Sequence, residues 1–245
     1  MGRKIGIGVA VLLVAAGIAA AVVLGKLGRI IERAVETVGP QLTGTPVALG
    51  GASVSVFSGE GALRSLAVAN PEGFTTPNAF DLGKVSVAVD VASVASDVVH
   101  VRSVVVDGPQ LVAEFDAQGR NNLKTILDHV QKVAGATSGS KAEQEAGAGK
   151  KMIIDEFRFE NAQVRALSVG AVKFDKSLKI PDVVLKDLGK KQGGAAAADI
   201  ADQIFRPVVN AAIKAARNEY LDAQKGKLED KAKEKGQELM DQLFD

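Results

Sequence analysis

Residues 84–91 of the chain, Lys-Val-Ser-Val-Ala-Val-Asp-Val, alternate strictly between valine and another residue that is small, polar or charged. Successive side chains of a strand point to opposite faces of a sheet, so this period of two predicts a strand with one apolar and one wet face. Val85, Val87, Val89 and Val91 form the apolar face. They are the candidate functional surface, and two readings stay open: a packed core, or a face that contacts lipid.

Segments of similar character flank this stretch on both sides. Strands are predicted at residues 52–57, 63–69, 98–106 and 111–115. They are separated by turn sequences rich in glycine and proline, namely Gly59-Glu60-Gly61, Asn70-Pro71-Glu72-Gly73 and Asp107-Gly108-Pro109. Connections this short predict antiparallel meanders, because a parallel pair needs a crossover of a dozen or more residues.

A sheet with one apolar face needs a cover, and a helix is predicted directly after the last of these strands. Over residues 122–134 the apolar side chains recur at helical spacing: Leu123, Ile126, Leu127 and Val130. Asn121 or Asn122 is the predicted N-cap.

The second half of the chain contains a linker, more strands and a helical tail. Residues 135–149 are mainly Gly, Ala, Ser, Lys and Glu, which is typical of a flexible linker. Strands are then predicted from Lys151, with Ile153, Phe157 and Phe159 on the apolar face, and at residues 164–169, 172–180 and 183–188.

The C-terminal third is predicted to be helical. An apolar stripe runs through Ile200, Ile204, Val208 and Ala212, and Pro207 is expected to kink or interrupt it. From Lys225 onward the chain is mostly charged. This tail is interpreted either as a solvated helix with a weak oligomerising seam or as an unstructured segment.

The N-terminus carries a predicted membrane span. Residues 5–24 are uncharged, and eleven of the twenty are Ile, Leu or Val. At about 1.5 Å per residue they reach about 30 Å, the thickness of the hydrocarbon core. The helical pattern continues through Ile30, Ile31 and Val38. A cleaved secretory signal with Ala19-Ala20-Ala21 at the cleavage site is the alternative.

The short basic leader, Arg3 and Lys4, predicts a cytoplasmic N-terminus and a translocated main domain. The fold class is therefore α+β and mainly β: an N-terminal transmembrane helix, an antiparallel curved sheet or sheets covered by a helix, and a long C-terminal helical tail. The predicted parts are the anchor and juxtamembrane helix (1–38), a β-rich domain with its covering helix (46–134), a linker (135–150), a second β lobe (151–190) and a charged helical tail (195–245).

Composition and motifs exclude most catalytic chemistry. The chain has no cysteine, which excludes thiol catalysis and disulfides, and a net charge of +1, which gives no general field for nucleic acid. His100 and His129 are its two histidines, and no sequence pattern pairs either with a nucleophile. No metal, phosphate or cofactor motif is present. The sequence thus predicts no catalytic, cofactor-binding or metal site, and no enzyme.

An ordered series of short motifs resembles the N-terminal domain of the AsmA family. The series is Leu-Ala-Val-Ala-Asn-Pro-Glu-Gly-Phe (66–74), Ala-Phe-Asp-Leu-Gly-Lys-Val-Ser-Val (79–87), Ser93, the strand at 100–106, Gly108-Pro109 and Gly-Arg-Asn-Asn-Leu (119–123). An uncleaved anchor directly before the domain is also similar to the family, and residues 180–189 resemble its short members.

This resemblance implies a single-pass protein of the bacterial inner membrane with a periplasmic domain. Larger relatives, the TamB-like and bridge-like lipid-transfer proteins, conduct acyl chains along a curved apolar sheet. The β portion here is too short to cross a periplasm, since a strand gains only about 3.3 Å per residue. Two functions follow as expectations: a non-enzymatic factor for lipid handling or outer-membrane and envelope biogenesis, or a membrane-tethered scaffold that binds a protein partner through its C-terminal helix. The expected partners are the bilayer, a phospholipid ligand and that protein.

Overall fold

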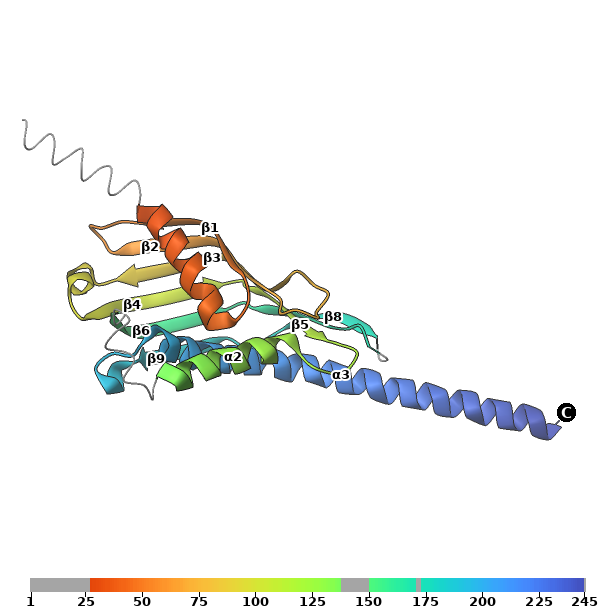
Figure 1. Cartoon of the computed structure of the whole chain (residues 1–245). Coiled ribbons are helices and arrows are strands. Elements are labelled where there is room, and N and C mark those ends of the chain that lie inside the picture. Colours follow the sequence, from red (N-terminus) through yellow and green to blue (C-terminus); the bar gives the residue numbers. More distant parts are fainter. Residues whose placement is uncertain (1–26, 138–149, 171–172, 245) are drawn as a thin grey trace, which may run out of the picture.

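The computed structural model describes residues 27–137, 150–170 and 173–244. Its strands and helices are drawn in Figure 1. The strands are β1 (Val47–Val54), β2 (Glu60–Ala69), β3 (Asn78–Val89), β4 (Val98–Asp107), β5 (Gln110–Phe115), β6 (Lys151–Glu160), β7 (Gln163–Ser168), β8 (Phe174–Lys179) and β9 (Val183–Leu188). The helical elements are a helix over residues 27–43, the 3-10 turns η1 (Val91–Ala95) and η3 (Lys190–Gln192), α2 (Asn122–Thr137) and α3 (Ala197–Phe244).

The fold is α+β and mainly β, as predicted, but its strands form a single mixed sheet. The order is β8-β7-β5-β3-β4-β6-β9, with β2 also paired to β3 and β1 to β2. The prediction of purely antiparallel pairing is wrong for two pairs, because β4 pairs with β6 in parallel and β5 with β7 in parallel. After β5 the chain enters α2 before it returns as β6, and a connection of this length permits a parallel pair.

The strands do not divide into two separate β lobes as predicted, because all nine of the described strands belong to one sheet. β6 pairs with β4 from Val98↔Lys151 to Asp107↔Glu160, and the side chains of Phe157 and Phe159 join the same core cluster as those of Val85 and Val106. Residues 138–149, most of the predicted linker, lie outside the described residues. The segment therefore follows α2 and precedes β6, and the strands before and after it belong to one sheet.

A kink crosses the sheet at the same level in several strands. β3 pairs with β4 at one end and with β5 at the other. The register is the same in both pairings, as the pairs Val85↔Val106 and Phe80↔Leu111 show. Val85 and Phe80 are five residues apart, so strict alternation would place them on opposite faces, yet both belong to one core cluster. Three residues near this level have left-handed backbone. They are Ser65 within β2, Gly108 between β4 and β5, and Asn161 between β6 and β7. We infer that one extra residue per strand resets the alternation and keeps the same face apolar.

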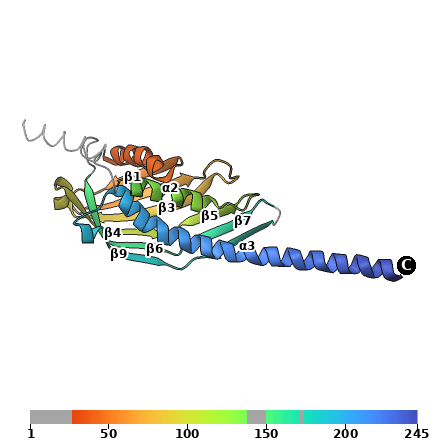
Figure 2. The same ribbon diagram turned by 60° about the horizontal axis from the view of Figure 1, so that its bottom comes forward.

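Two helices cover the apolar face, as Figure 2 shows from a second direction. In α2, Leu123, Ile126, Leu127 and Val130 are buried, which confirms the predicted covering helix. Asn121 caps it, since its Oδ1 accepts a hydrogen bond from the backbone N–H of Lys124 (3.1 Å). α3 contributes Ile200, Val208, Val209, Ala212 and Ala216 to the core.

α3 is one helix of 48 residues, about 72 Å long, and it runs through Pro207. The expectation that Pro207 interrupts the helix is therefore wrong. A proline inside a helix costs about 3 kcal/mol through a lost hydrogen bond and a steric clash. Val208 and Val209 directly after it are buried, and we infer that their packing offsets this cost.

The helix over residues 27–43 lies along the edge strand β1. Glu36 Oε1 accepts a hydrogen bond from the backbone N–H of Leu49 (3.3 Å), and Glu32 Oε1 accepts one from that of Ala52 (3.2 Å). These contacts satisfy edge groups that would otherwise be open to pairing with another strand. Among the described residues, no helix is both long and apolar enough for a bilayer; the predicted span at residues 5–24 lies outside them.

Candidate functional site

The four valines predicted as the apolar face differ in their exposure. Val85 is buried, Val87 and Val89 are half-buried, and Val91 is 41% exposed. Val91 also departs from the prediction in another way: β3 ends at Val89, and Val91 begins the turn η1. The apolar side of β3 is thus core at its centre and becomes more accessible toward η1.

The neighbouring strand shows the same gradient. Val106 is buried, and its neighbours along β4 on the apolar face, Val104 and Val101, are half-buried. Val104 pairs with both Val87 and Phe157. We call Val87, Val89, Val101 and Val104 the valine strip. These side chains are the half-buried valines of this face on β3 and β4, next to the buried pair Val85 and Val106.

The turn η1 is closed by a residue of the motif series. The Ser93 hydroxyl donates to the backbone carbonyl of Asp90 (2.6 Å) and accepts from the backbone N–H of His100 (2.8 Å). Ser93 is buried. Its role is therefore to hold the η1 turn against β4.

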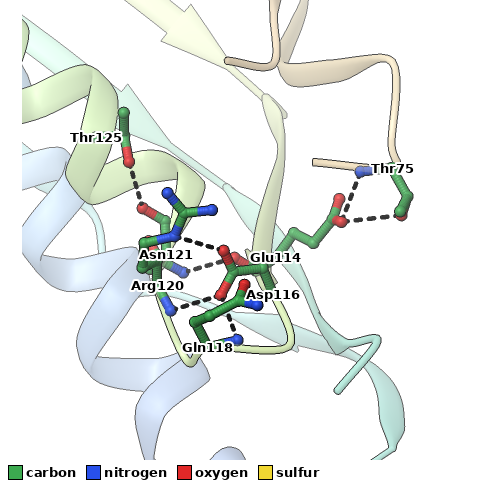
Figure 3. Close-up of polar contacts among 7 residues, drawn as sticks. All are labelled: Thr75, Glu114, Asp116, Gln118, Arg120, Asn121 and Thr125. Carbon is green, nitrogen blue, oxygen red and sulfur yellow. Dashed lines mark hydrogen bonds and ion pairs between the residues drawn. The ribbon is translucent and has the colours of Figure 1, made fainter. Parts of the chain in front are cut away.

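Two further motifs of the series meet in a buried polar network near the other end of the sheet. Figure 3 shows the part of this region in which Glu114 faces Thr75 and Asp116 faces Arg120. Glu114 on β5 has no exposed surface. Its Oε1 accepts hydrogen bonds from the backbone N–H (2.7 Å) and hydroxyl (2.9 Å) of Thr75. Its Oε2 accepts from the N–H (2.9 Å) and hydroxyl (2.7 Å) of Thr76. One carboxylate therefore holds the loop between β2 and β3 against β5.

Asn122 at the start of α2 extends this network. Its Nδ2 donates to Asn70 Oδ1 (2.6 Å) and to the carbonyl of Val112 (2.8 Å), and its Oδ1 accepts from the N–H of Glu114 (2.8 Å). Asn70 Nδ2 donates to the carbonyl of Thr76 (2.8 Å). The Asn-Pro-Glu-Gly and Gly-Arg-Asn-Asn motifs, whose residues Asn70 and Asn122 are 52 positions apart in sequence, thus hold the same corner of the fold.

Asp116 organises the turn between β5 and α2. Its Oδ1 accepts from the backbone N–H groups of Gln118 (2.9 Å) and Arg120 (2.8 Å), and its Oδ2 accepts from Arg120 Nε (2.7 Å). Burial raises the pKa of both Asp116 and Glu114, but these hydrogen bonds outweigh burial, and each pKa lies below its usual value. Both carboxylates are charged acceptors at neutral pH and have structural partners.

Sequence reasoning missed Glu114, although a signal was present. It is a charged residue inside the apolar strand Leu-Val-Ala-Glu-Phe, and a charged residue is rarely fully buried unless it is paired. The two histidines lie apart: His100 is half-buried in β4, and His129 Nε2 lies 3.2 Å from the carbonyl oxygen of Gln41. In the described part of the chain, no group of three His, Asp or Glu residues is arranged to hold a metal.

The fold and site define a mainly-β domain with a kinked sheet, helices on its apolar face and an internal network at one corner. Residues 61–173, which run from β2 to just before β8, match the family model of the AsmA family. This match supports the assignment of the chain to the AsmA family. A comparison with curated proteins found no match. The match is consistent with a role related to the cell envelope or to lipids.

Proposed function

We propose that the chain is a membrane-tethered protein of the bacterial inner membrane whose periplasmic domain handles lipid acyl chains on the valine strip and thereby assists envelope biogenesis. The observation that carries this proposal is the gradient of exposure along β3 and β4. Apolar side chains continue from the buried core onto a less covered part of the same face. Family membership supports the same class of role.

The chemistry of the valine strip suits acyl chains rather than polar ligands. Its members are aliphatic, and contact with them would remove apolar surface from water at about 25 cal/mol per Å². The opposite face of the sheet is different: Arg158 lies 3.9 Å from a carboxylate oxygen of Glu156, Lys186 lies 3.9 Å from the other, and all three side chains are at least one-third exposed. The two faces thus differ in the ligand that each can accept.

Photo-crosslinking in cells tests this proposal. p-Benzoylphenylalanine is introduced at Val87 or Val104, the protein is purified after irradiation, and phospholipid adducts are measured by mass spectrometry. We expect adducts at both positions. The matched control is Val184, which is 52% exposed and pairs with Arg158 on the wet face. An equal yield at Val184, or no adduct at Val87 and Val104, would contradict lipid handling.

A second function, as a membrane-tethered scaffold, is favoured by the outer part of α3. The last side chain of α3 with aromatic core contacts is Tyr220, which stacks on Phe115, and from Lys225 onward the described side chains of the helix are exposed. Leu228 and Leu239 lie on this outer part and are exposed. A partner helix could pack on them.

Removal of residues 225–245 tests the scaffold. We expect the domain to stay folded, with an unchanged urea midpoint, because the removed side chains that the structure describes make no part of the core. A specific partner captured by the full chain should be lost. The double variant L228A/L239A keeps the helix length and should weaken the same partner. If every partner survives the deletion, α3 has no scaffold role.

A further inference from the structure

The turn between β1 and β2 presents one large apolar side chain to solvent. Phe57 is 92% exposed, the most exposed of the large hydrophobic residues that the structure describes. The turn itself is well ordered by backbone hydrogen bonds, from Gly59 N to the carbonyl of Ser55 (2.8 Å) and from Ser55 N to that of Glu60 (2.7 Å). An ordered turn that holds a phenylalanine in water exposes apolar surface without any packing gain.

The same end of the sheet carries further exposed apolar residues. Val91 and Val94 in η1 are 41% and 49% exposed. The hairpin and η1 are neighbours: Arg102 Nη2, on β4 after η1, donates to the carbonyl of Ser58 (2.9 Å), and a Cβ built on Gly59 would lie 3.0 Å from Val91 Cγ2. We call Phe57, Val91 and Val94 the apolar tip. The valine strip leads toward it.

The first described residues after the predicted membrane span also lie near this tip. The helix over residues 27–43 begins three residues after the apolar segment 5–24. A Cβ built on Gly28 would lie 2.5 Å from the carbonyl oxygen of Ala52, which places the start of the helix beside the end of β1. Ala52 is five residues from Phe57, about 16 Å along an extended chain. In Figure 1 the far end of α3 points away from this end of the sheet.

We infer that the apolar tip docks on the surface of the lipid bilayer, with Phe57 inserted among the acyl chains. This inference rests on the membrane tether of the proposed function. A phenylalanine side chain gains free energy when it moves from water into the apolar region of a membrane. Charges of both signs surround the tip, because Asp90 and Asp97 flank η1 and Lys150 Nζ donates a hydrogen bond to the carbonyl of Val94, so we assign the docking to apolar contact. The tether and the tip together orient the sheet with its less covered end at the membrane, where acyl chains are available.

Tryptophan fluorescence tests the docking, because the chain has no tryptophan of its own. The full chain is reconstituted into vesicles of phosphatidylethanolamine and phosphatidylglycerol as the single variants F57W, V94W and L228W. Leu228 is 68% exposed on the outer part of α3 and serves as the matched control. We expect blue-shifted emission and quenching by brominated acyl chains for F57W and V94W. L228W should emit as in water and be quenched by aqueous acrylamide.

The outcomes separate docking from lipid handling. Emission of F57W and V94W equal to that of L228W in vesicle-bound protein overturns the docking, whatever the crosslinking at Val87 and Val104 shows. Protein that does not float with the vesicles overturns both the docking and the tether. Quenching of Trp at position 57 without lipid adducts on the valine strip supports the docking and removes the lipid-handling role.

Discussion

The variant E114Q should lower the free energy of unfolding by about 2–4 kcal/mol at neutral pH, the loss expected when a buried acceptor of several charge-assisted hydrogen bonds is removed. Glu114 accepts four hydrogen bonds, two from each of Thr75 and Thr76. Glutamine keeps one acceptor oxygen and puts an NH₂ group against the other pair of donors. The backbone N–H of either Thr75 or Thr76 then loses its acceptor on Glu114. Urea denaturation of the full chain in mild detergent, followed by circular dichroism, measures the change.

The same variant should change how stability depends on pH. Because the pKa of Glu114 in the folded protein lies below its ordinary value of 4.5, its contribution is fully present above that value. The contribution is lost as the pH falls through the folded pKa. The gap between wild type and E114Q should therefore be constant from pH 6 to 8, to within roughly 0.5 kcal/mol, and should shrink below about pH 4.5. Asp116, whose pKa is also lowered, keeps some acid sensitivity in both proteins.

The matched control for this prediction is E60Q, which makes the same chemical change at an exposed position on β2. Its effect should stay within about 0.5 kcal/mol. If E114Q were as mild as E60Q, or if its effect were the same at pH 3.5 and pH 7, the buried network would not hold the loop of Thr75 and Thr76.

The local pattern of the sequence predicted most elements of this fold. Valine alternation at residues 84–89, the valine-rich segment 98–106 and helical spacing at residues 122–134 correspond to β3, β4 and α2. Whether a short segment forms a strand or a helix depends on the spacing of its apolar residues, and that spacing can be read from the segment itself. Residues 183–188 coincide with β9.

The pairing of strands and the kink were not visible in the same way. The parallel pairs depend on where the chain re-enters the sheet after α2, and the sequence of a single segment does not contain that information. The kink places Phe80 and Val85 on one face although they are five residues apart, so a strict period of two assigns one of them to the wrong face. The role of Glu114 was hidden for a similar reason, since its partners Thr75 and Thr76 lie nearly forty residues earlier. The resemblance named the motifs that contain Asn70 and Asn122 but did not predict their contact.

The variant F115A should be the most destabilising single change among those considered, at about 3–5 kcal/mol, because a buried phenylalanine leaves a large cavity. The Phe115 ring stacks on Tyr220 of α3 at 4.9 Å between centroids and packs beside Phe174 of β8 at 6.3 Å. It thereby joins β5, β8 and the last packed turn of α3. F57A removes the same side chain from a position that is 92% exposed and should change the stability of the detergent-solubilised chain by no more than about 0.5 kcal/mol. Loss of α3 protection near Tyr220 in hydrogen exchange should accompany F115A but not F57A. Equal urea midpoints for the two variants would mean that the outer half of α3 is not anchored through Phe115.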